Sequence, residues 1–217
     1  MNTIKTSTRT LRTGNVVAYP TESFFALGAD ATNTRAVRKV FRLKGREKKP
    51  IALIAGSVAQ VERFFVVSAA ERRLMKRYWP PFDKAHGRGA VTIVLKPKAG
   101  IATRALFGLT TPSRRAPRSG HPSSTRRGIE GSPRIGVRVP RHATARKLAL
   151  AFGKPITATS ANISGHKPTK LHTVVARTFR GIVMVNGACG ASKKPSTVVS
   201  TSQGTIQVLR RGAVNVK

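Results

Sequence analysis

The chain has 217 residues, of which 41 are Lys or Arg and 7 are Asp or Glu, so its formal net charge is +34, and 40% of its residues are hydrophobic. That length suits one domain or two small ones, and the apolar fraction is enough for a buried core, which excludes a disordered basic tail. The single cysteine, Cys189, excludes an internal disulfide and a CxxC zinc site. Carboxylates are so few that we expect no metal held by protein ligands.

The charge predicts polyanionic partners such as nucleotides, RNA or DNA, because Lys and Arg supply most of the sequence-independent affinity for phosphates. A basic bias shared by all proteins of the source would give the same composition. No apolar run approaches the ~20 residues that span a bilayer, so we expect a cytoplasmic protein without a membrane partner. Residues 1–13 are acid-free, as in transit peptides. We disfavour that interpretation, because a strand-like run follows at once.

Hydrophobic spacing predicts strands alternating with helices in the first half of the chain. A buried strand at residues 16–18 should stop at Pro20, which cannot donate a ladder hydrogen bond. Asn33 or Thr34 can cap a helix with one apolar and one basic face. Strands are expected at 51–55 and 90–95. Helices are expected around 58–65 and after Ser68, where Ser68 and Glu71 have capping-box spacing.

Residues 112–134 break this pattern. They contain six Arg, five Ser, four Pro and one Glu, without an aromatic residue. Such a segment cannot bury enough apolar surface to offset the entropy of ordering. We therefore predict a disordered basic insertion inside a single domain of residues 1–217.

Strands are predicted again at 135–139, 156–159, 182–185, 197–199 and 205–209, with helices at 144–152 and 171–179. The last two strands are too close together for a helix between them, so the sheet should contain both parallel and antiparallel strands. The predicted class is α/β, a single domain with a twisted mixed sheet flanked by helices.

The chain lacks GxxxxGK[ST], GxGxxG after a strand, HExxH and a plausible carboxylate pair, which excludes ordinary P-loop, dinucleotide-binding and zinc-hydrolase functions. Loops rich in hydroxyls and cations follow the strands instead. Thr21 and Ser23 flank an acid and can bind an amino-acid-sized ligand, or merely cap a turn. Lys44, Arg46 and Lys49 can neutralise a triphosphate, or form a solvated helix end.

Three later loops have the same character. Residues 157–165 hold four hydroxyl residues, Asn162 and a closing glycine, which lets backbone N–H groups approach a phosphate or a base. The other two loops carry Arg138 with His142, and Ser196 with Arg210 downstream. A lone His or Arg of this kind is more often structural than catalytic.

Taken together, the motifs YPTES, LGADATN, LKGR, VRVPRH, TSANISG, PSTVV and LRRGA resemble the YrdC-like family, the threonylcarbamoyl-AMP synthases. They occur in family order from about Gly14 to Val214. The resemblance implies a concave basic cavity that binds ATP, L-threonine and bicarbonate, with Mg²⁺ arriving on ATP. It also implies tRNA or double-stranded RNA and downstream threonylcarbamoyl transferase proteins as partners.

The resemblance further implies roles for individual residues. Lys44 and Arg46 would be catalytic. The ATP-binding residues would be Lys44, Arg46, Lys49, Arg138, Ser160, Asn162 and Arg210. The threonine-binding residues would be Thr21, Ser23, His142, Ala158 and Ser196. The chain departs from the family pattern at Ile54, at Ser200 and after Trp79, which bears on substrate affinity more than on fold.

Two alternatives remain open. The first is a protein of this fold that uses its basic surface for RNA or ribosome binding with little or no catalysis, since fold does not fix function. A carbamoyl-transferring module of a larger maturation enzyme is disfavoured, because we find no additional catalytic domain in the sequence.

Overall fold

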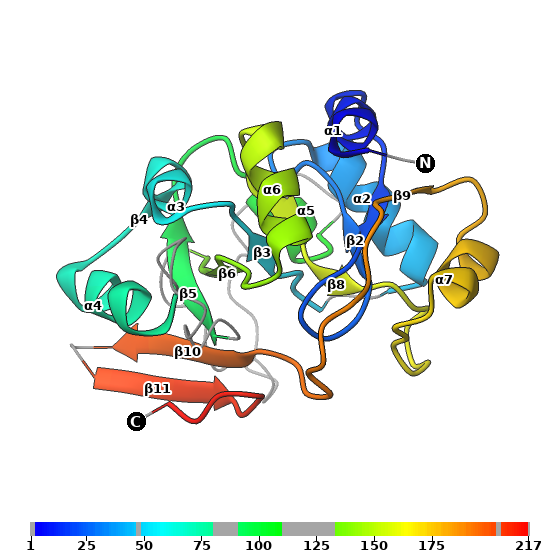
Figure 1. Ribbon diagram of the computed structural model, residues 1–217. Helices are drawn as coiled ribbons and strands as arrows, with labels where there is room; N and C mark the ends of the chain where they lie inside the picture. The colour runs from blue at the N-terminus through cyan, green and yellow to red at the C-terminus, as the bar shows by residue number, and fades with distance from the viewer. Residues whose placement is uncertain (1–2, 47–48, 80–90, 110–132, 203–204, 217) are drawn as a thin grey trace, which may run out of the picture.

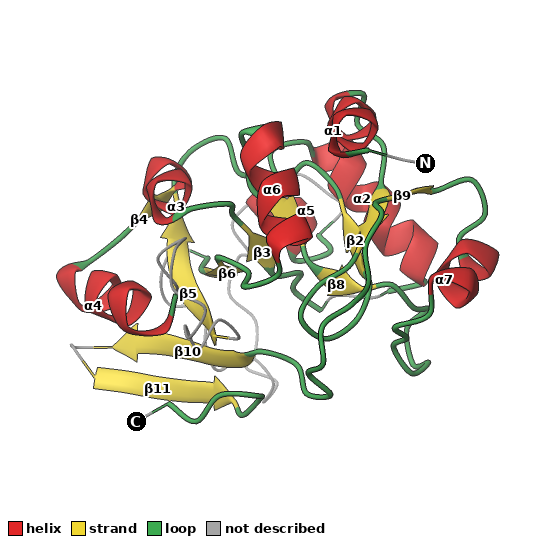
Figure 2. Cartoon of the chain, in the orientation of Figure 1, coloured by secondary structure: helices red, strands yellow, loops and turns green. Residues whose placement is uncertain are grey.

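The computed structural model describes residues 3–46, 49–79, 91–109, 133–202 and 205–216. Its strands form two mixed sheets flanked by helices (Figures 1 and 2). The predicted α/β domain with parallel and antiparallel strands is confirmed, but the strands are divided between two sheets. The predicted insertion at 112–134 lies outside the described residues except for its last two positions.

The smaller sheet has the strand order β8-β2-β1-β9. Strand β1 (Val17–Tyr19) runs antiparallel to β2 (Ala26–Gly28) and parallel to β9 (Val183–Met184), and β2 pairs with β8 (Thr159–Ser160). Both faces of β1 are covered. Val17 and Tyr19 belong to one hydrophobic cluster and Ala18 to the other, as the alternation of side chains along a strand requires.

The larger sheet has the order β11-β10-β5-β6-β3-β7, and the short β4 (Phe65–Val66) pairs with β5. Its remaining strands are β3 (Leu53–Ile54), β5 (Val91–Pro97), β6 (Ile135–Arg138), β7 (Ile156–Thr157), β10 (Thr197–Ser202) and β11 (Thr205–Arg210). The last two are antiparallel neighbours, whereas β10 runs parallel to β5, so this sheet is mixed, as predicted. The single strand expected at 156–159 is instead two strands: β7 pairs with β3 in the larger sheet and β8 with β2 in the smaller.

Helices cover both faces of the smaller sheet. Helices α1 (Ile4–Arg12) and α6 (Ala143–Phe152) share a hydrophobic cluster with Val17 and Tyr19, whereas α2 (Thr34–Lys44) packs into the cluster of Ala18. The other helices are α3 (Val58–Phe64), α4 (Ala69–Tyr78), α5 (Thr103–Leu106) and α7 (His172–Thr178). Figure 1 places α1, α2 and α7 at one end of the molecule and α4 with β10 and β11 at the other.

The predicted helix caps are confirmed. The Asn33 side chain accepts hydrogen bonds from the backbone N–H groups of Arg35 and Ala36 at 3.0 and 3.1 Å, which starts α2. Ser68 and Glu71 form both bonds of the capping box at the start of α4. These local signals act within four residues, which is why sequence alone could place them.

Helix α1, helix α5 and strand β2 were not predicted. Helix α1 has few large apolar residues, and its buried face is completed by Ser7 and Thr8, whose hydroxyls donate to backbone carbonyls of the preceding turn. Strand β2 was expected as loop, because it has only three residues and gains its partners from β1 and β8. In the part of the chain that the structure describes, no helix is long and apolar enough to cross a membrane.

Candidate functional site

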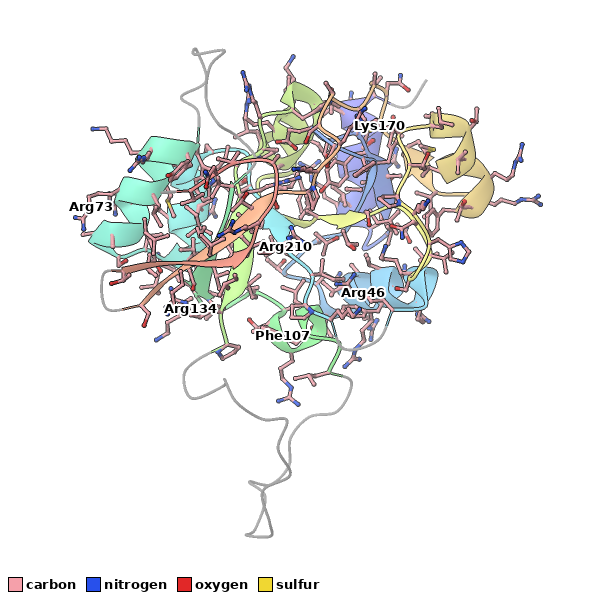
Figure 3. The ribbon with its side chains drawn as sticks, turned by 90° about the horizontal axis from the view of Figure 1, so that it is seen from below. Arg46, Arg73, Phe107, Arg134, Lys170 and Arg210 are labelled. Atoms are coloured by element: carbon pink, nitrogen blue, oxygen red, sulfur yellow. The ribbon has the colours of Figure 1, made fainter. Side chains whose placement is uncertain are left out.

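A cavity of about 300 Å³ is lined by residues of both sheets and of the loops between them. Eight of the twelve predicted site residues line it: Thr21, Ser23, Arg46, Arg138, Ala158, Ser160, Ser196 and Arg210. They come from segments spread over most of the chain. In Figure 3, Arg46 and Arg210 lie near the middle of the molecule, whereas Arg73 lies at its outer edge.

The charge of this cavity is positive. Arg46, Arg138 and Arg210 line it, and none of the described residues lining it is Asp or Glu. Burial lowers the pKa of Arg46, and burial together with the charge of Arg138 lowers the pKa of Arg210. Guanidinium groups stay protonated at neutral pH, so these arginines keep their positive charge at the cavity. An anionic ligand would balance that charge.

Gly45 separates the two cations of the LKGR motif. It ends α2 in the left-handed conformation, with φ 55°, which glycine adopts without steric cost. Lys44 turns inward and is 1% exposed. Its Nζ donates to the carbonyl oxygens of Ser160 and, at 2.7 Å, Asn162. Arg46 remains at the cavity, where Nε and Nη2 donate to the carbonyls of Lys49 and Pro50, both at 3.0 Å.

Lys44 therefore braces the loop that carries Ser160 and Asn162. Its Nζ also lies 3.4 Å from Asn162 Oδ1, and it is not among the residues that line the cavity. The structure thus brings together Lys44, Arg46, Ser160 and Asn162. Of these four, Arg46 and Ser160 line the cavity. Lys44 and Asn162 lie behind them.

The pKa of Lys44 gives a pH prediction. Burial, and then the neighbouring charge of Arg46, lower this pKa from 10.5 to about 8. Between about pH 8 and pH 10.5, the Lys44 amine is mostly protonated in the unfolded chain and mostly neutral in the folded chain. The unfolded state therefore binds more protons, and the contribution of Lys44 to stability increases as pH rises through this range. We expect the unfolding free energy of the wild type minus that of Lys44→Met to be larger at about pH 9.5 than at about pH 7, in urea titrations. A constant difference would show that Lys44 stays protonated throughout.

The YPTES loop enters the cavity through Thr21 and Ser23. Thr21 Oγ1 donates to the carbonyl of Phe24 at 2.7 Å and accepts from the N–H of Ser23 at 3.3 Å, so it caps a turn and lines the cavity at once. Glu22, between them, was not predicted as a site residue. Its Oε2 lies 3.3 Å from Arg138 Nη2, and its Oε1 accepts from the backbone N–H of Arg141 at 2.5 Å. Glu22 is one of only seven acidic residues in the chain, and this rarity is the sequence feature that could have indicated its role.

Replacing Glu22 by Gln should lower the unfolding free energy by about 2–4 kcal/mol, because it removes the carboxylate that balances a largely buried guanidinium. The two side chains are 13% and 11% exposed. Glu62→Gln is the matched control, since Glu62 and its partner Arg72 are 32% and 61% exposed. That change should shift stability by no more than about 1 kcal/mol. Equal effects in urea denaturation would contradict the assigned role of the Glu22–Arg138 pair.

Ser196 and Arg210 are joined at the other side of the cavity. Arg210 Nη2 donates to the Ser196 carbonyl at 2.8 Å and lies 3.3 Å from its hydroxyl, which is 2.8 Å from Thr92 Oγ1. Thr92 also lines the cavity, but it was not predicted as a site residue. It lies inside β5, where nothing in the sequence distinguishes it from other strand residues. A Cβ on Gly212 would lie 2.4 Å from the Pro195 carbonyl oxygen, which explains the glycine of the LRRGA motif.

Two other predicted residues do not line the cavity. Lys49 is exposed. His142 caps α6, with Nδ1 accepting from the N–H of Ala145 at 3.5 Å and Nε2 within 2.8 Å of the Ala188 carbonyl oxygen. These contacts match the structural alternative for a lone histidine, so a threonine contact by His142 stays a prediction. The described residues include no group of three or more His, Cys, Asp or Glu side chains that could hold a metal ion.

The fold and the cavity together define an α/β protein with an arginine-lined cavity between two sheets. The model of the Sua5/YciO/YrdC family, whose description reads "Telomere recombination", matches residues 9–212. The chain belongs to this family. It is 35% identical, over 90% of its own length and 89% of the relative, to the threonylcarbamoyl-AMP synthase of Thiobacillus denitrificans.

Two solved structures are similar to the whole described chain. Sua5 of Pyrococcus abyssi in complex with L-threonine has a TM-score of 0.75 and 29% identity, and the match covers 96% of this chain and 54% of that one. This chain thus spans about half the length of that protein. YciO of Escherichia coli has a TM-score of 0.74 at 24% identity, covering 99% and 91% of the two chains, and shows the shared fold.

Proposed function

We propose that the protein is an L-threonylcarbamoyladenylate synthase, which forms threonylcarbamoyl-AMP and pyrophosphate from ATP, L-threonine and bicarbonate or CO₂. The observation that carries the proposal is the joining of three arginines and a set of hydroxyl residues in one cavity. The curated name of the Thiobacillus relative and the threonine complex of the Pyrococcus protein support the same activity. The product would serve tRNA modification through downstream threonylcarbamoyl transferase proteins.

The chemistry needs no protein nucleophile. The threonine amine takes up CO₂ as a carbamate, and a carbamate oxygen attacks the α-phosphorus of ATP while the bond to pyrophosphate breaks. Positioning of the two substrates and neutralisation of phosphate charge can supply the rate acceleration. Arginines suit this task because their planar donors match phosphate oxygens.

We assign ATP to the side of the cavity formed by Arg46, Arg138, Ser160 and Arg210. Lys44 and Asn162 hold the Ser160 loop in place behind it, and Lys49 lies at its edge. Threonine is assigned to Thr21, Ser23, Ala158 and Ser196, and a contact from His142, the N-cap of α6, stays a prediction. Mg²⁺ would arrive on the triphosphate, where it neutralises charge. Its usual sites combine few carboxylates with substrate phosphates, which fits a region with so few acids.

A direct test is pyrophosphate release by the purified protein with ATP and bicarbonate, in the presence and absence of L-threonine. We expect release that depends on threonine. Release that ignores threonine, or no release at all, would contradict the proposal. The alternative, an RNA-binding protein of this fold without catalysis, would then be favoured. At present it has less support, because it does not explain why the hydroxyl residues converge beside the arginines.

A further inference from the structure

Lys170 connects separate segments of the chain beside the cavity, although it is not one of the described residues that line it. The side chain is only partly exposed. Its Nζ donates a hydrogen bond to the backbone carbonyl of Gly190 at 2.7 Å and lies 6.0 Å from the centre of the Phe24 ring. Phe24 lines the cavity, and so does Pro168, just before Lys170 in the chain. Lys170 therefore lies directly behind part of the cavity wall.

Gly190, which accepts the hydrogen bond from Lys170, packs against the YPTES loop. Its N–H donates to the carbonyl of Thr21 at 2.9 Å, and the N–H of Ser192 donates to the carbonyl of Glu22 at 3.1 Å. A Cβ at position 190 would lie 2.7 Å from the Glu22 carbonyl oxygen, so this close approach requires a glycine. The hydrogen bond from Lys170 thus fixes a loop that packs directly on the backbone of Thr21 and Glu22.

The YPTES loop is also contacted by the segment that carries Lys170. The ammonium group lies over the Phe24 ring, and cations and aromatic rings attract each other at this distance. The N–H of Phe25 donates to the carbonyl of Thr169 at 3.2 Å. Residues 21–25 are therefore supported by two segments that follow them by more than 100 residues, and Lys170 links these two segments to each other.

We propose that Lys170 is a positioning residue for L-threonine, an inference that rests on the proposed function. Thr21 and Ser23, which we assign to threonine, lie in the loop that Lys170 supports from two sides. Substrate hydroxyl contacts contribute fully only when the loop that carries them is held in the productive geometry. An ammonium group suits this task, because its charge-assisted hydrogen bond to a carbonyl is stronger than a neutral one. Within the described residues, neither contact of Lys170 involves the ATP side of the cavity.

The test measures pyrophosphate release at varied L-threonine with saturating ATP, and at varied ATP with saturating L-threonine. We expect Lys170→Met to raise the KM for L-threonine about tenfold, the effect of losing one hydrogen bond from a charged donor. The KM for ATP should stay within about twofold of the wild type. Lys170→Arg keeps the charge and the donors, so it should restore the KM for L-threonine to within about threefold of the wild type.

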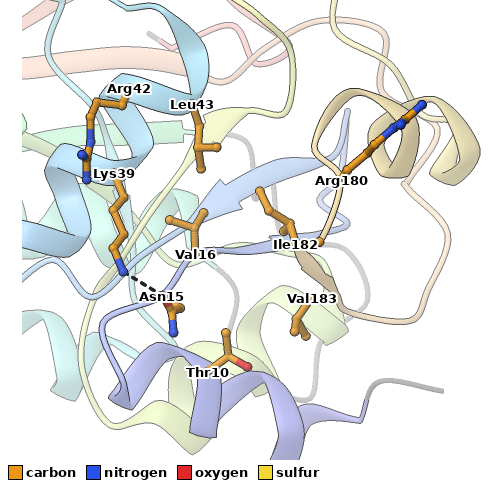
Figure 4. Close-up of a pocket in the computed structure, with 10 residues that line it drawn as sticks. Thr10, Asn15, Val16, Lys39, Arg42, Leu43, Arg180, Ile182 and Val183 are labelled. Atoms are coloured by element: carbon orange, nitrogen blue, oxygen red, sulfur yellow. Dashed lines mark hydrogen bonds between the residues drawn. The ribbon is translucent and has the colours of Figure 1, made fainter.

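Lys39→Met is the matched control. Lys39 is also partly exposed, and its Nζ donates to Asn15 Oδ1 at 2.8 Å, as Figure 4 shows. Both residues line a second groove, of about 810 Å³, between α1, α2 and residues 180–183, and none of the described residues that line this groove lines the cavity. The control removes one lysine charge and one hydrogen bond, as Lys170→Met does. Both of its KM values should stay within about twofold of the wild type.

An unchanged KM for L-threonine in Lys170→Met would overturn the proposal, and a lowered urea midpoint with unchanged KM values would make Lys170 a purely structural residue. Equal increases of the two KM values, or equal effects of Lys170→Met and Lys39→Met, would also overturn it, since they would indicate a general loss of charge or order. The failure of the proposed function is distinguishable. Without threonine-dependent release by the wild type, both proposals fail, whereas an active Lys170→Met enzyme with a normal KM for L-threonine refutes this inference alone.

Discussion

Replacing Arg46 by Ala should lower kcat/KM for ATP by about 10²–10³, the usual loss when one fixed donor to a developing phosphate or oxyanion charge is removed. Arg46 lines the cavity and is held by two backbone carbonyls, so its guanidinium is oriented before the ligand arrives. Pre-oriented donors stabilise charge without reorganisation during the reaction. The measurement is the initial rate of threonine-dependent pyrophosphate release at varied ATP.

The matched control is Arg42→Ala, one helical turn earlier. Arg42 is exposed and is not among the residues that line the cavity. This change should leave kcat/KM for ATP within about twofold of the wild type, because a solvated charge at this distance is screened by salt. Equal losses of activity in both variants would show that Arg46 makes no specific contact with ATP. Both proteins should unfold within about 1 kcal/mol of the wild type.

The second large effect is expected from Lys44→Met. The substitution keeps most of the side-chain volume and removes the donor to the carbonyls of Ser160 and Asn162, which would leave polar groups unpaired in a buried place. Each such group costs about 1–3 kcal/mol, and removal of the buried charge offsets part of that, so we expect a net loss of about 2–4 kcal/mol near neutral pH. Pyrophosphate release should also be lost, because the loop that carries Ser160 is no longer held in place.

Urea denaturation and the pyrophosphate assay together separate two roles for Lys44. Loss of both stability and activity supports the bracing role inferred from its contacts. Loss of activity with an unchanged unfolding midpoint would show that Lys44 acts on ATP directly, as the family resemblance implied. Lys76→Met is the control, since Lys76 is exposed on α4 and should alter neither quantity.

The tertiary structure also changed the meaning of individual motifs. The sequence predicts one cationic cluster at LKGR, yet Lys44 is buried and Arg46, beyond the left-handed Gly45 that ends α2, lines the cavity. The strand predicted at 156–159 is two strands in different sheets. No local pattern reveals such a step, because the partners β3 and β2 lie more than 100 residues earlier in the chain.

Sequence alone determined the features that depend on neighbouring residues: the Asn33 cap, the capping box of Ser68 and Glu71, the end of β1 at Pro20 and most strands and helices. The order of motifs also indicated the family and eight of the residues that line the cavity. Only the tertiary structure decided that Lys44 is buried, that Glu22 pairs with Arg138, and that the basic face of α2 borders a second groove. The physical reason is distance along the chain, since charge, burial and pairing depend on segments that only folding brings together.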